Sequence, residues 1–373
     1  MECSEKLEWN RYCLEELKRI TIDLPSEMVK QQVFEHWDRV AKPMDGLGKF
    51  EAIIASIGAI QGNELVHLAK RAVIIMCADN GVVAEGISQS GQEVTAIVAE
   101  KMANMQSSVG MMAQIIGMDT IPVDIGINRV EQIPGVLDRK IRYGTRNFAV
   151  EPAMSEEETV RAIAVGIELV RKCKNDGYQL LAAGEMGIGN TTTSSAVAAA
   201  LLGCRVEKVT GRGAGLDDAR LEKKIRVIDQ ALRKYELSER PDVYEPDLAL
   251  RALQCVGGLD IAGLVGVCIG GAMYHVPIIL DGVISLIAAL VAERLIPGTR
   301  HYFIASHAGK EPAIRRLLEE LGLHAVIDAE LALGEGTGAV MMMGLLDMAL
   351  AVYHTETTFT DMKIQQYERY QKR

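Results

Sequence analysis

Two glycine-rich segments of this chain each carry one glutamate that could do chemistry. Residues 184–192 read Gly-Glu-Met-Gly-Ile-Gly-Asn-Thr-Thr, and residues 333–339 read Leu-Gly-Glu-Gly-Thr-Gly-Ala. Each segment leads into an alanine-rich stretch that predicts a helix, and glycine lets backbone N–H groups approach a ligand, so an anion could bind at either helix N-terminus. A carboxylate in such a turn can accept a proton or bind a hydroxyl group. We therefore predict that Glu185 and Glu335 are functional.

Each glutamate also has a structural explanation. Glu335 precedes a helix that we expect from Gly338 onward, where the macrodipole favours a negative charge. Glu185 could instead bond backbone N–H groups of its own turn. Asn190 or Thr191 could cap the following helix, expected to run to residue 202. The residues by themselves leave these alternatives open.

A third glycine-rich loop, residues 211–218, resembles a dinucleotide-binding turn only loosely, because no acidic residue stands at the spacing that ribose binding requires. Asp217 and Asp218 at its end are typical of a helix start rather than a metal site. Of seven histidines, only His307 follows a predicted strand, and no pair has metal-ligand spacing on one helix. We predict no metal site.

The elements that must position these residues alternate along the chain. Apolar, β-branched runs separated by helical patterns predict an α/β fold, a parallel sheet with helices on both faces in a Rossmann-like three-layer arrangement. Most runs end in polar or glycine-rich sequence, and ligands of such sheets bind beyond the carboxyl ends of the strands. The motifs should therefore converge on one edge. The strand candidates are Ala72 to Cys77, Thr120 to Val123, Tyr178 to Ala183, Val276 to Leu280, Tyr302 to Ala305 and His324 to Ile327.

The chain ends read as helical or polar. Helical periodicity covers residues 5–22 and 26–40, with Ser26 as a plausible N-cap. The apolar region 261–280 contains many glycines and predicts a core helix followed by a strand rather than a membrane span. Residues 360–373 are strongly polar and predict an exposed helix or a frayed tail.

Composition indicates a soluble enzyme. The 373 residues are 49% hydrophobic and 24% charged, with a formal net charge of −10 that argues against a nucleic-acid surface. Seven cysteines without a CxxC pair indicate reduced thiols in a cytosolic protein, and the N-terminus lacks a signal-peptide core. We expect a cytoplasmic protein that binds small molecules and neither nucleic acid nor membrane.

With four further motifs, the two glutamate segments resemble the nicotinate-nucleotide:dimethylbenzimidazole phosphoribosyltransferases of cobamide lower-ligand assembly. The resemblance runs from about residue 42 to about residue 358. It implies a homodimer without cofactor, in which residues 1–60 with 340–373 form a small helical domain and residues 61–339 a large α/β catalytic domain. The further motifs are Ala78-Asp79-Asn80-Gly81-Val82, Gly144-Thr145-Arg146-Asn147, Asp281-Gly282 and Ser306-His307.

The same resemblance implies roles for individual residues. Glu335 matches the general base that takes the N–H proton of a benzimidazole while the other ring nitrogen attacks C1′ of the ribosyl group. Lys224 matches a family lysine near the active site, although a surface lysine is an alternative because Lys223 adjoins it. The implied nucleotide-binding residues are Glu185, Gly187, Gly189, Asn190, Thr191, Gly213, Gly215, Lys224, Gly282 and Ser306. The implied base-binding residues are Ser90, Met186 and Leu333.

The reaction that the resemblance implies moves 5-phosphoribosyl from nicotinate mononucleotide to 5,6-dimethylbenzimidazole or a related base. Its products are α-ribazole 5′-phosphate and nicotinate. One alternative is a phosphoribosyltransferase or hydrolase with a purine or phenolic acceptor. Another is a non-catalytic nucleotide-binding sensor, against which the intact Glu185 and Glu335 argue.

The chain departs from the family pattern at several positions. Asp45-Gly46 stands where Gly-Ser is usual, Asn80 where histidine is common, and Val98 where glutamine can occur. Ala332 replaces a frequent arginine and Gly309 a frequent serine, both near the nucleotide in the family. These changes bear on the choice of base and on nucleotide affinity more than on the catalytic assignment.

Overall fold

The computed structural model describes residues 12–213, 215–238 and 246–369. Its six strands form one parallel sheet in the order β3-β2-β1-β4-β5-β6. From β1 the chain adds β2 and β3 on one side of the sheet, and β4, β5 and β6 on the other side. The strand order therefore reverses between β1 and β4, and doubly wound sheets bind ligands at such switch points. The strands are β1 (Arg71–Ala78), β2 (Asp119–Gly126), β3 (Leu137–Asp138), β4 (Leu180–Met186), β5 (Ile278–Leu280) and β6 (Phe303–Ala305).

Helices fill most of the intervals between strands, precede β1 and follow β6. They are α1 (Leu14–Lys18), α2 (Glu27–Arg39), α3 (Lys49–Gln61), α4 (Glu93–Ala103), α5 (Ser108–Ile115), α6 (Glu156–Asn175), α7 (Asn190–Leu202), α8 (Asp218–Lys234), α9 (Pro246–Val256), α10 (Leu259–Met273), α11 (Val283–Leu295), α12 (Ile314–Leu321) and α13 (Thr337–Tyr353).

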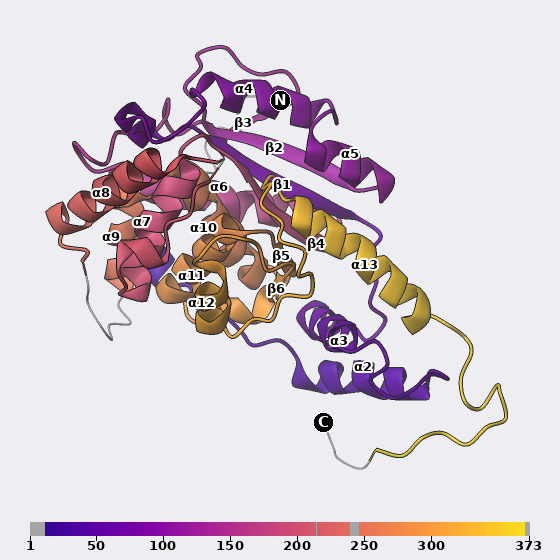
Figure 1. Cartoon of the computed structure of the whole chain (residues 1–373). Coiled ribbons are helices and arrows are strands. Elements are labelled where there is room, and N and C mark those ends of the chain that lie inside the picture. Colours follow the sequence, from indigo (N-terminus) through magenta and orange to yellow (C-terminus); the bar gives the residue numbers. More distant parts are fainter. Residues whose placement is uncertain (1–11, 214, 239–245, 370–373) are drawn as a thin grey trace.

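The central strand β1 divides its side chains between two cores, because successive residues of a strand point to opposite faces. Ile74 and Met76 join a cluster formed mainly with α6, α7, α9, α10 and α11, whereas Val73 and Ile75 join a cluster with α2, α3, α4, α5 and α13. Figure 1 shows these two helical layers on either side of the sheet. The predicted three-layer α/β fold is confirmed.

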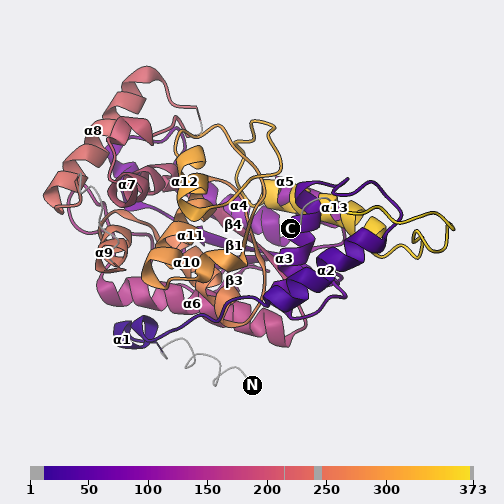
Figure 2. The ribbon, with the colours of Figure 1, turned by 90° about the horizontal axis from the view of Figure 1, so that it is seen from below.

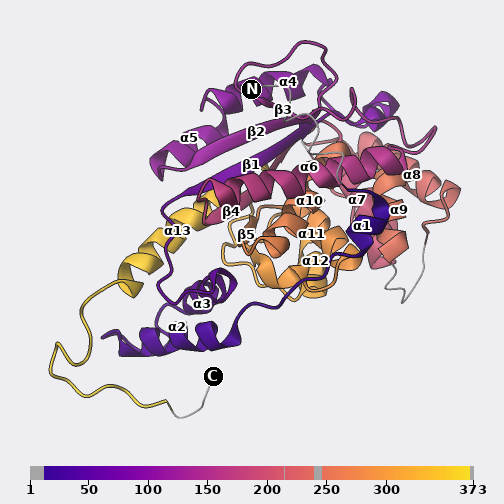
Figure 3. The ribbon, with the colours of Figure 1, turned by 180° about the vertical axis from the view of Figure 1, so that it is seen from behind.

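Segments from both ends of the chain lie side by side. Helix α2 packs on α3, and α13 packs on α3 and against β4 and α5. Beyond α13 the backbone returns to α2, where Val40 pairs with Thr358 and Arg369 forms ion pairs with Asp38 and Asp45. Figure 2 shows α2, α3 and the C-terminal segment together at one end of the molecule. Figure 3 shows α1 apart from them, beside α6 and α9, in agreement with Leu17 lying in the other core.

Several local predictions are confirmed. Ser26 caps α2 by accepting a hydrogen bond from Val29 N, and Asp217 caps α8 in the same way from Arg220 N. Region 261–280 is α10 followed by β5, and no helix among the described residues is both long and apolar enough to cross a bilayer. The described thiols of Cys13, Cys77, Cys173, Cys204, Cys255 and Cys268 are free, and Cys3 lies outside the described residues.

Other local predictions are wrong or incomplete. Residues 324–327 are no strand: after α12 they form only a single bridge, between Ile327 and His307. The two-residue strand β3 was not predicted. It lies at the edge of the sheet, where Asp138 is exposed, and therefore has no apolar run in the sequence. The first helix covers only Leu14–Lys18 of the predicted 5–22, of which residues 5–11 lie outside the description. Residues 360–369 are exposed for the most part and not helical.

Candidate active site

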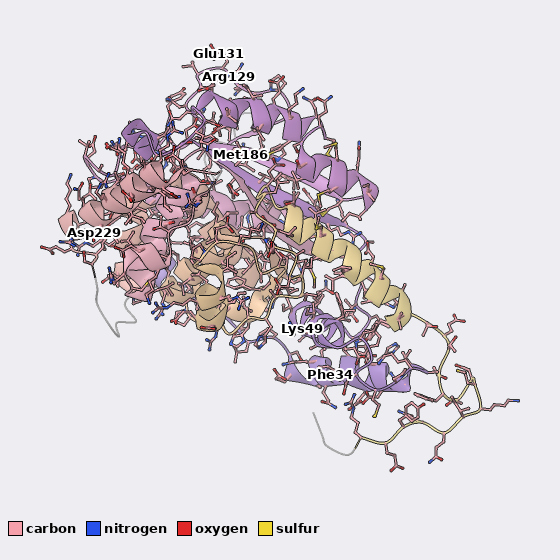
Figure 4. The ribbon with its side chains drawn as sticks, viewed as in Figure 1. Phe34, Lys49, Arg129, Glu131, Met186 and Asp229 are labelled. Atoms are coloured by element: carbon pink, nitrogen blue, oxygen red, sulfur yellow. The ribbon has the colours of Figure 1, made fainter. Side chains whose placement is uncertain are left out.

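A pocket of about 240 Å³ lies beyond the carboxyl ends of β4, β5 and β6. Both glutamate segments line it, together with residues that follow β5 and β6. Figure 4 labels Met186, the last residue of β4, near the carboxyl ends of the central strands. The predicted site residues in the lining are Glu185, Met186, Gly187, Asn190, Thr191, Gly213, Gly282, Leu333 and Glu335.

Glycines bring the two segments into direct backbone contact. A β-carbon placed on Gly184 would lie 2.6 Å from the carbonyl oxygen of Glu335, and one on Gly336 would lie 3.3 Å from Gly184 Cα. A β-carbon on Gly334 would lie 2.7 Å from Glu185 Oε1. The sequence suggested that these glycines admit a ligand. In the folded chain their lack of a side chain lets one segment pack on the other, which places both carboxylates in one pocket.

Glu335 adopts a left-handed backbone conformation, with a φ of 62°, in the turn before α13. Its Oε2 accepts a hydrogen bond of 3.2 Å from Val109 N in the first turn of α5. Burial raises the pKa of Glu335, and the Val109 N–H group acts in the opposite direction. The Glu335 carboxylate thus bonds the N-terminus of α5. The macrodipole alternative had instead placed it at the N-terminus of the helix that follows it.

Glu185 lies in β4 rather than in a turn, because β1 extends beside it and pairs Met76 with Glu185. The side-chain amide of Asn190 donates a hydrogen bond to Glu185 Oε2. Burial first, then the nearby charges of Asp260 and Asp281, raise the pKa of Glu185 to about 8. The partner of Glu185 is thus the Asn190 side chain, and not the backbone N–H groups of its own turn that the sequence offered as an alternative.

The predicted cap of α7 is wrong. The helix begins after Gly189, which has a φ of 94° and no capping side chain, while Asn190 turns to Glu185. The hydroxyl oxygen of Thr191 accepts a hydrogen bond of 3.0 Å from Lys224 Nζ, which also donates to the carbonyl of Gly211 at 3.0 Å.

Lys224 is fully buried, so the surface alternative for it is wrong. Burial lowers its pKa to about 8, against the influence of Glu311. Lys224 lies behind Thr191 rather than in the pocket wall. Such a buried ammonium, bonded to Thr191 of the pocket lining, is a suitable partner for an anionic group bound there.

Asp281 and His307 line the pocket, and neither was given a role from sequence. Asp281 follows β5 directly and is 4% exposed; it accepts hydrogen bonds from the backbone of the turn that carries Glu335. His307 follows β6, and its Nδ1 lies 3.0 Å from the hydroxyl oxygen of Ser306. Burial raises the pKa of Asp281 to about 7 and lowers that of His307. Their position just after predicted strands was the available signal.

The remaining predicted residues are not part of the pocket lining. Gly189 directly precedes α7, and the carbonyl of Gly215 accepts a hydrogen bond from the Gln89 side chain. The hydroxyl of Ser306 lies within hydrogen-bond distance of the His307 ring. Ser90 belongs to the loop before α4, where its N–H donates to Ser88 Oγ.

The departures from the family pattern differ in setting. Val98 packs in the same apolar core as Met186 and does not line the pocket. Asn80 is fully buried and donates to the Ile188 carbonyl, while Ala332 is exposed at the pocket wall. A β-carbon at Gly309 would lie 2.7 Å from the Leu331 carbonyl oxygen, so a serine there would need the backbone to move.

Known proteins match this chain over most of its length. A family model described as Phosphoribosyltransferase matches residues 22–364. The chain belongs to this family. A nicotinate-nucleotide–dimethylbenzimidazole phosphoribosyltransferase from Acetivibrio thermocellus is 41% identical over 344 residues, which are 92% of this chain and 95% of the relative. One from Geobacter metallireducens is 40% identical over 329 residues, 88% of this chain and 91% of the relative.

Solved structures of family members have the same fold. A crystal structure titled as the nicotinate-nucleotide–dimethylbenzimidazole phosphoribosyltransferase of Thermus thermophilus superposes with a TM-score of 0.82 at 36% identity, covering 92% of this chain and all of the other. A second Thermus thermophilus structure, titled CobT, has a TM-score of 0.83 at 37% identity and covers 91% of this chain. Within the described residues, no group of three or more histidine, cysteine or acidic side chains could hold a metal ion.

Proposed function

We propose that this chain transfers the 5-phosphoribosyl group of nicotinate mononucleotide to 5,6-dimethylbenzimidazole or a related base, in cobamide biosynthesis. The observation that carries the proposal is the direct packing of Gly184 on Glu335, which puts two carboxylates into one pocket at the edge where a doubly wound sheet binds ligands. The names of relatives at 36–41% identity support the same reaction.

Glu335 is the general base of this proposal. One ring nitrogen of the base attacks C1′ as the bond from C1′ to the pyridinium nitrogen breaks, and Glu335 takes the proton from the other ring nitrogen. The electron pair of the broken bond neutralises the pyridinium ring, so the leaving group needs no acid. Catalysis then consists of positioning both substrates and removing one proton.

The nucleotide is proposed to occupy the side of the pocket formed by Thr191, Gly213 and Gly282, with Lys224 behind Thr191 as the source of positive charge. The flat base would lie between Met186 and Leu333, with Ser90 at its margin. The other proposed nucleotide-binding residues are Glu185, Gly187, Gly189, Asn190, Gly215 and Ser306.

The wider organisation is also a proposal. Residues 1–60 and 340–373 would act as a small helical domain, supported by the packing of α2, α3 and α13, although α1 contacts the opposite core. The large domain would be residues 61–339. The protein is proposed to be cytoplasmic and to form a homodimer. Analytical ultracentrifugation of the purified chain would test the homodimer.

The test of function is a mass-spectrometric assay with nicotinate mononucleotide and a panel of benzimidazoles, purines and phenols. Nicotinate release that depends on a benzimidazole, with formation of the ribazole phosphate, is the expected result. Transfer only to purines or phenols, release without any base, or binding without turnover would each overturn the proposal and identify another acceptor, a hydrolase or a sensor.

A further inference from the structure

We infer that Asp281 is a positioning residue whose carboxylate holds the turn that carries Glu335 in one conformation. The inference rests on the proposed function, in which the turn has to place Glu335 as the general base. Asp281 itself contacts the backbone of the turn, and through that backbone it fixes where the Glu335 side chain points.

The carboxylate of Asp281 accepts hydrogen bonds from three backbone N–H groups that follow Glu335 in the chain. Oδ2 accepts from Gly336 N at 3.2 Å, and Oδ1 accepts from Gly338 N at 2.7 Å and from Ala339 N at 3.1 Å. Helix α13 begins after Gly336, which offers no capping side chain. Asp281, 55 residues away in sequence, satisfies the N–H groups that the helix start leaves open.

The turn needs such a restraint because its backbone is unfavourable. Gly334, Glu335 and Gly336 follow one another with φ angles of 85°, 62° and 94°. Two glycines adopt this left-handed conformation readily, but a glutamate does not, so the surrounding structure must impose it. Gly184 limits the turn by direct contact with the Glu335 carbonyl, and Asp281 holds it through hydrogen bonds to the backbone that follows.

Asp281 is itself confined by its neighbours. His307 Nδ1 lies 3.9 Å from Oδ1, and the Ser306 hydroxyl donates to the Asp281 carbonyl at 3.2 Å. The same imidazole limits the turn, since a β-carbon at Gly338 would lie 2.1 Å from His307 Nδ1. The residues that follow β5 and β6 thus pack directly against the start of α13.

The experiment compares Asp281→Ala and Asp281→Asn with Glu335→Gln and with the two double variants that join each change at position 281 to Glu335→Gln. A misplaced base costs about a hundredfold in rate per ångström, so Asp281→Ala should lower kcat by roughly that factor, with the KM for nicotinate mononucleotide changing less than about threefold. Asp281→Asn keeps the shape and one oxygen acceptor and should lower kcat less. In the Glu335→Gln background neither change should lower kcat further, because the residue they position is already inactive.

Hydrogen–deuterium exchange of residues 334–340 measures the turn directly, and it should be faster in both Asp281 variants. The control is Asp347→Asn, which removes a carboxylate of α13 that pairs with Arg71 and leaves the turn untouched; its kcat and its exchange at 334–340 should equal those of the wild type. If circular dichroism shows Asp281→Ala unfolded, Asp281→Asn decides.

Unchanged exchange at 334–340 in the Asp281 variants would overturn the inference. So would a further loss of kcat in the double variants equal to that in the single ones, because Asp281 would then act on the substrate directly. Failure of the proposed function has a different signature: no wild-type transfer to any base, with the exchange comparison still decisive for the role of Asp281.

Discussion

The backbone of Gly184 in β4 lies directly against the backbone of Glu335, so that an added β-carbon on Gly184 would come within 2.6 Å of the Glu335 carbonyl oxygen. Gly184 pairs with Ile75 across the sheet and lacks a positive φ, so space alone requires glycine there. The contact joins segments about 150 residues apart in sequence and sets the distance between the two carboxylates of the pocket.

Replacement of Gly184 by alanine should therefore push the two segments apart. We expect kcat/KM to fall by about a hundredfold or more, the scale of a one-ångström misplacement, while the far-ultraviolet circular dichroism stays that of the wild type. Gly344→Ala is the matched control, because its β-carbon would meet only Ile116 at an ordinary 3.5 Å. Equal activity of the two variants would mean that the spacing of the segments is unimportant.

Glu335→Gln keeps the size of the side chain and its acceptor for Val109 N but cannot take a proton. Turnover should fall by roughly a hundredfold or more, with little change in nucleotide affinity measured by calorimetry. In the wild type, kcat should decline as the pH falls through the pKa of Glu335, which burial raises above its ordinary value of 4.5. The variant should lack this acidic limb, and its persistence in the variant would assign the limb to another group.

Lys224→Met tests the buried ammonium. Bonds to charged groups contribute about 1.5–3 kcal/mol, so affinity for nicotinate mononucleotide should weaken by roughly ten- to a hundredfold. Burial lowers the pKa of Lys224 to about 8, so removing this buried charge should offset part of the stability lost with its bonds to Thr191 and Gly211. Lys223→Met, next to it but exposed, is the control and should bind normally. Calorimetry with wild-type affinity for Lys224→Met would place the phosphate elsewhere.

The raised pKa of Glu185 predicts how stability depends on pH. Folded Glu185 keeps its proton up to a pKa of about 8, whereas the unfolded residue loses it near pH 4.5. The folded state therefore binds more protons between these values, and the free energy of unfolding should fall as the pH rises from 5 to 8. Glu185→Gln should flatten this decline in urea titrations by less than about 1.4 kcal/mol per pH unit, the limit for one group. The exposed Glu100→Gln should retain the full slope, and an identical slope for Glu185→Gln would contradict the prediction.

Much of the framework could be predicted from local sequence. The continuous apolar run of β1 indicates a strand buried on both faces, and the polar or glycine residues after β4, β5 and β6 place the site at one edge of the sheet. Ser26 and Asp217 predict helix starts correctly, because an N-cap needs only one side chain and the next turn of backbone. Such features depend on neighbours a few residues away.

The partners of the functional side chains depended on the tertiary structure. Glu335 meets the N–H group of Val109, 226 residues away, and Lys224 is buried behind Thr191 although it adjoins an exposed lysine. The periodicity of one segment says which face is apolar, but not which distant helix end or carboxylate will meet it. Packing of the two layers on the sheet decides that, because burial and hydrogen bonding between remote segments are satisfied together only in the folded chain.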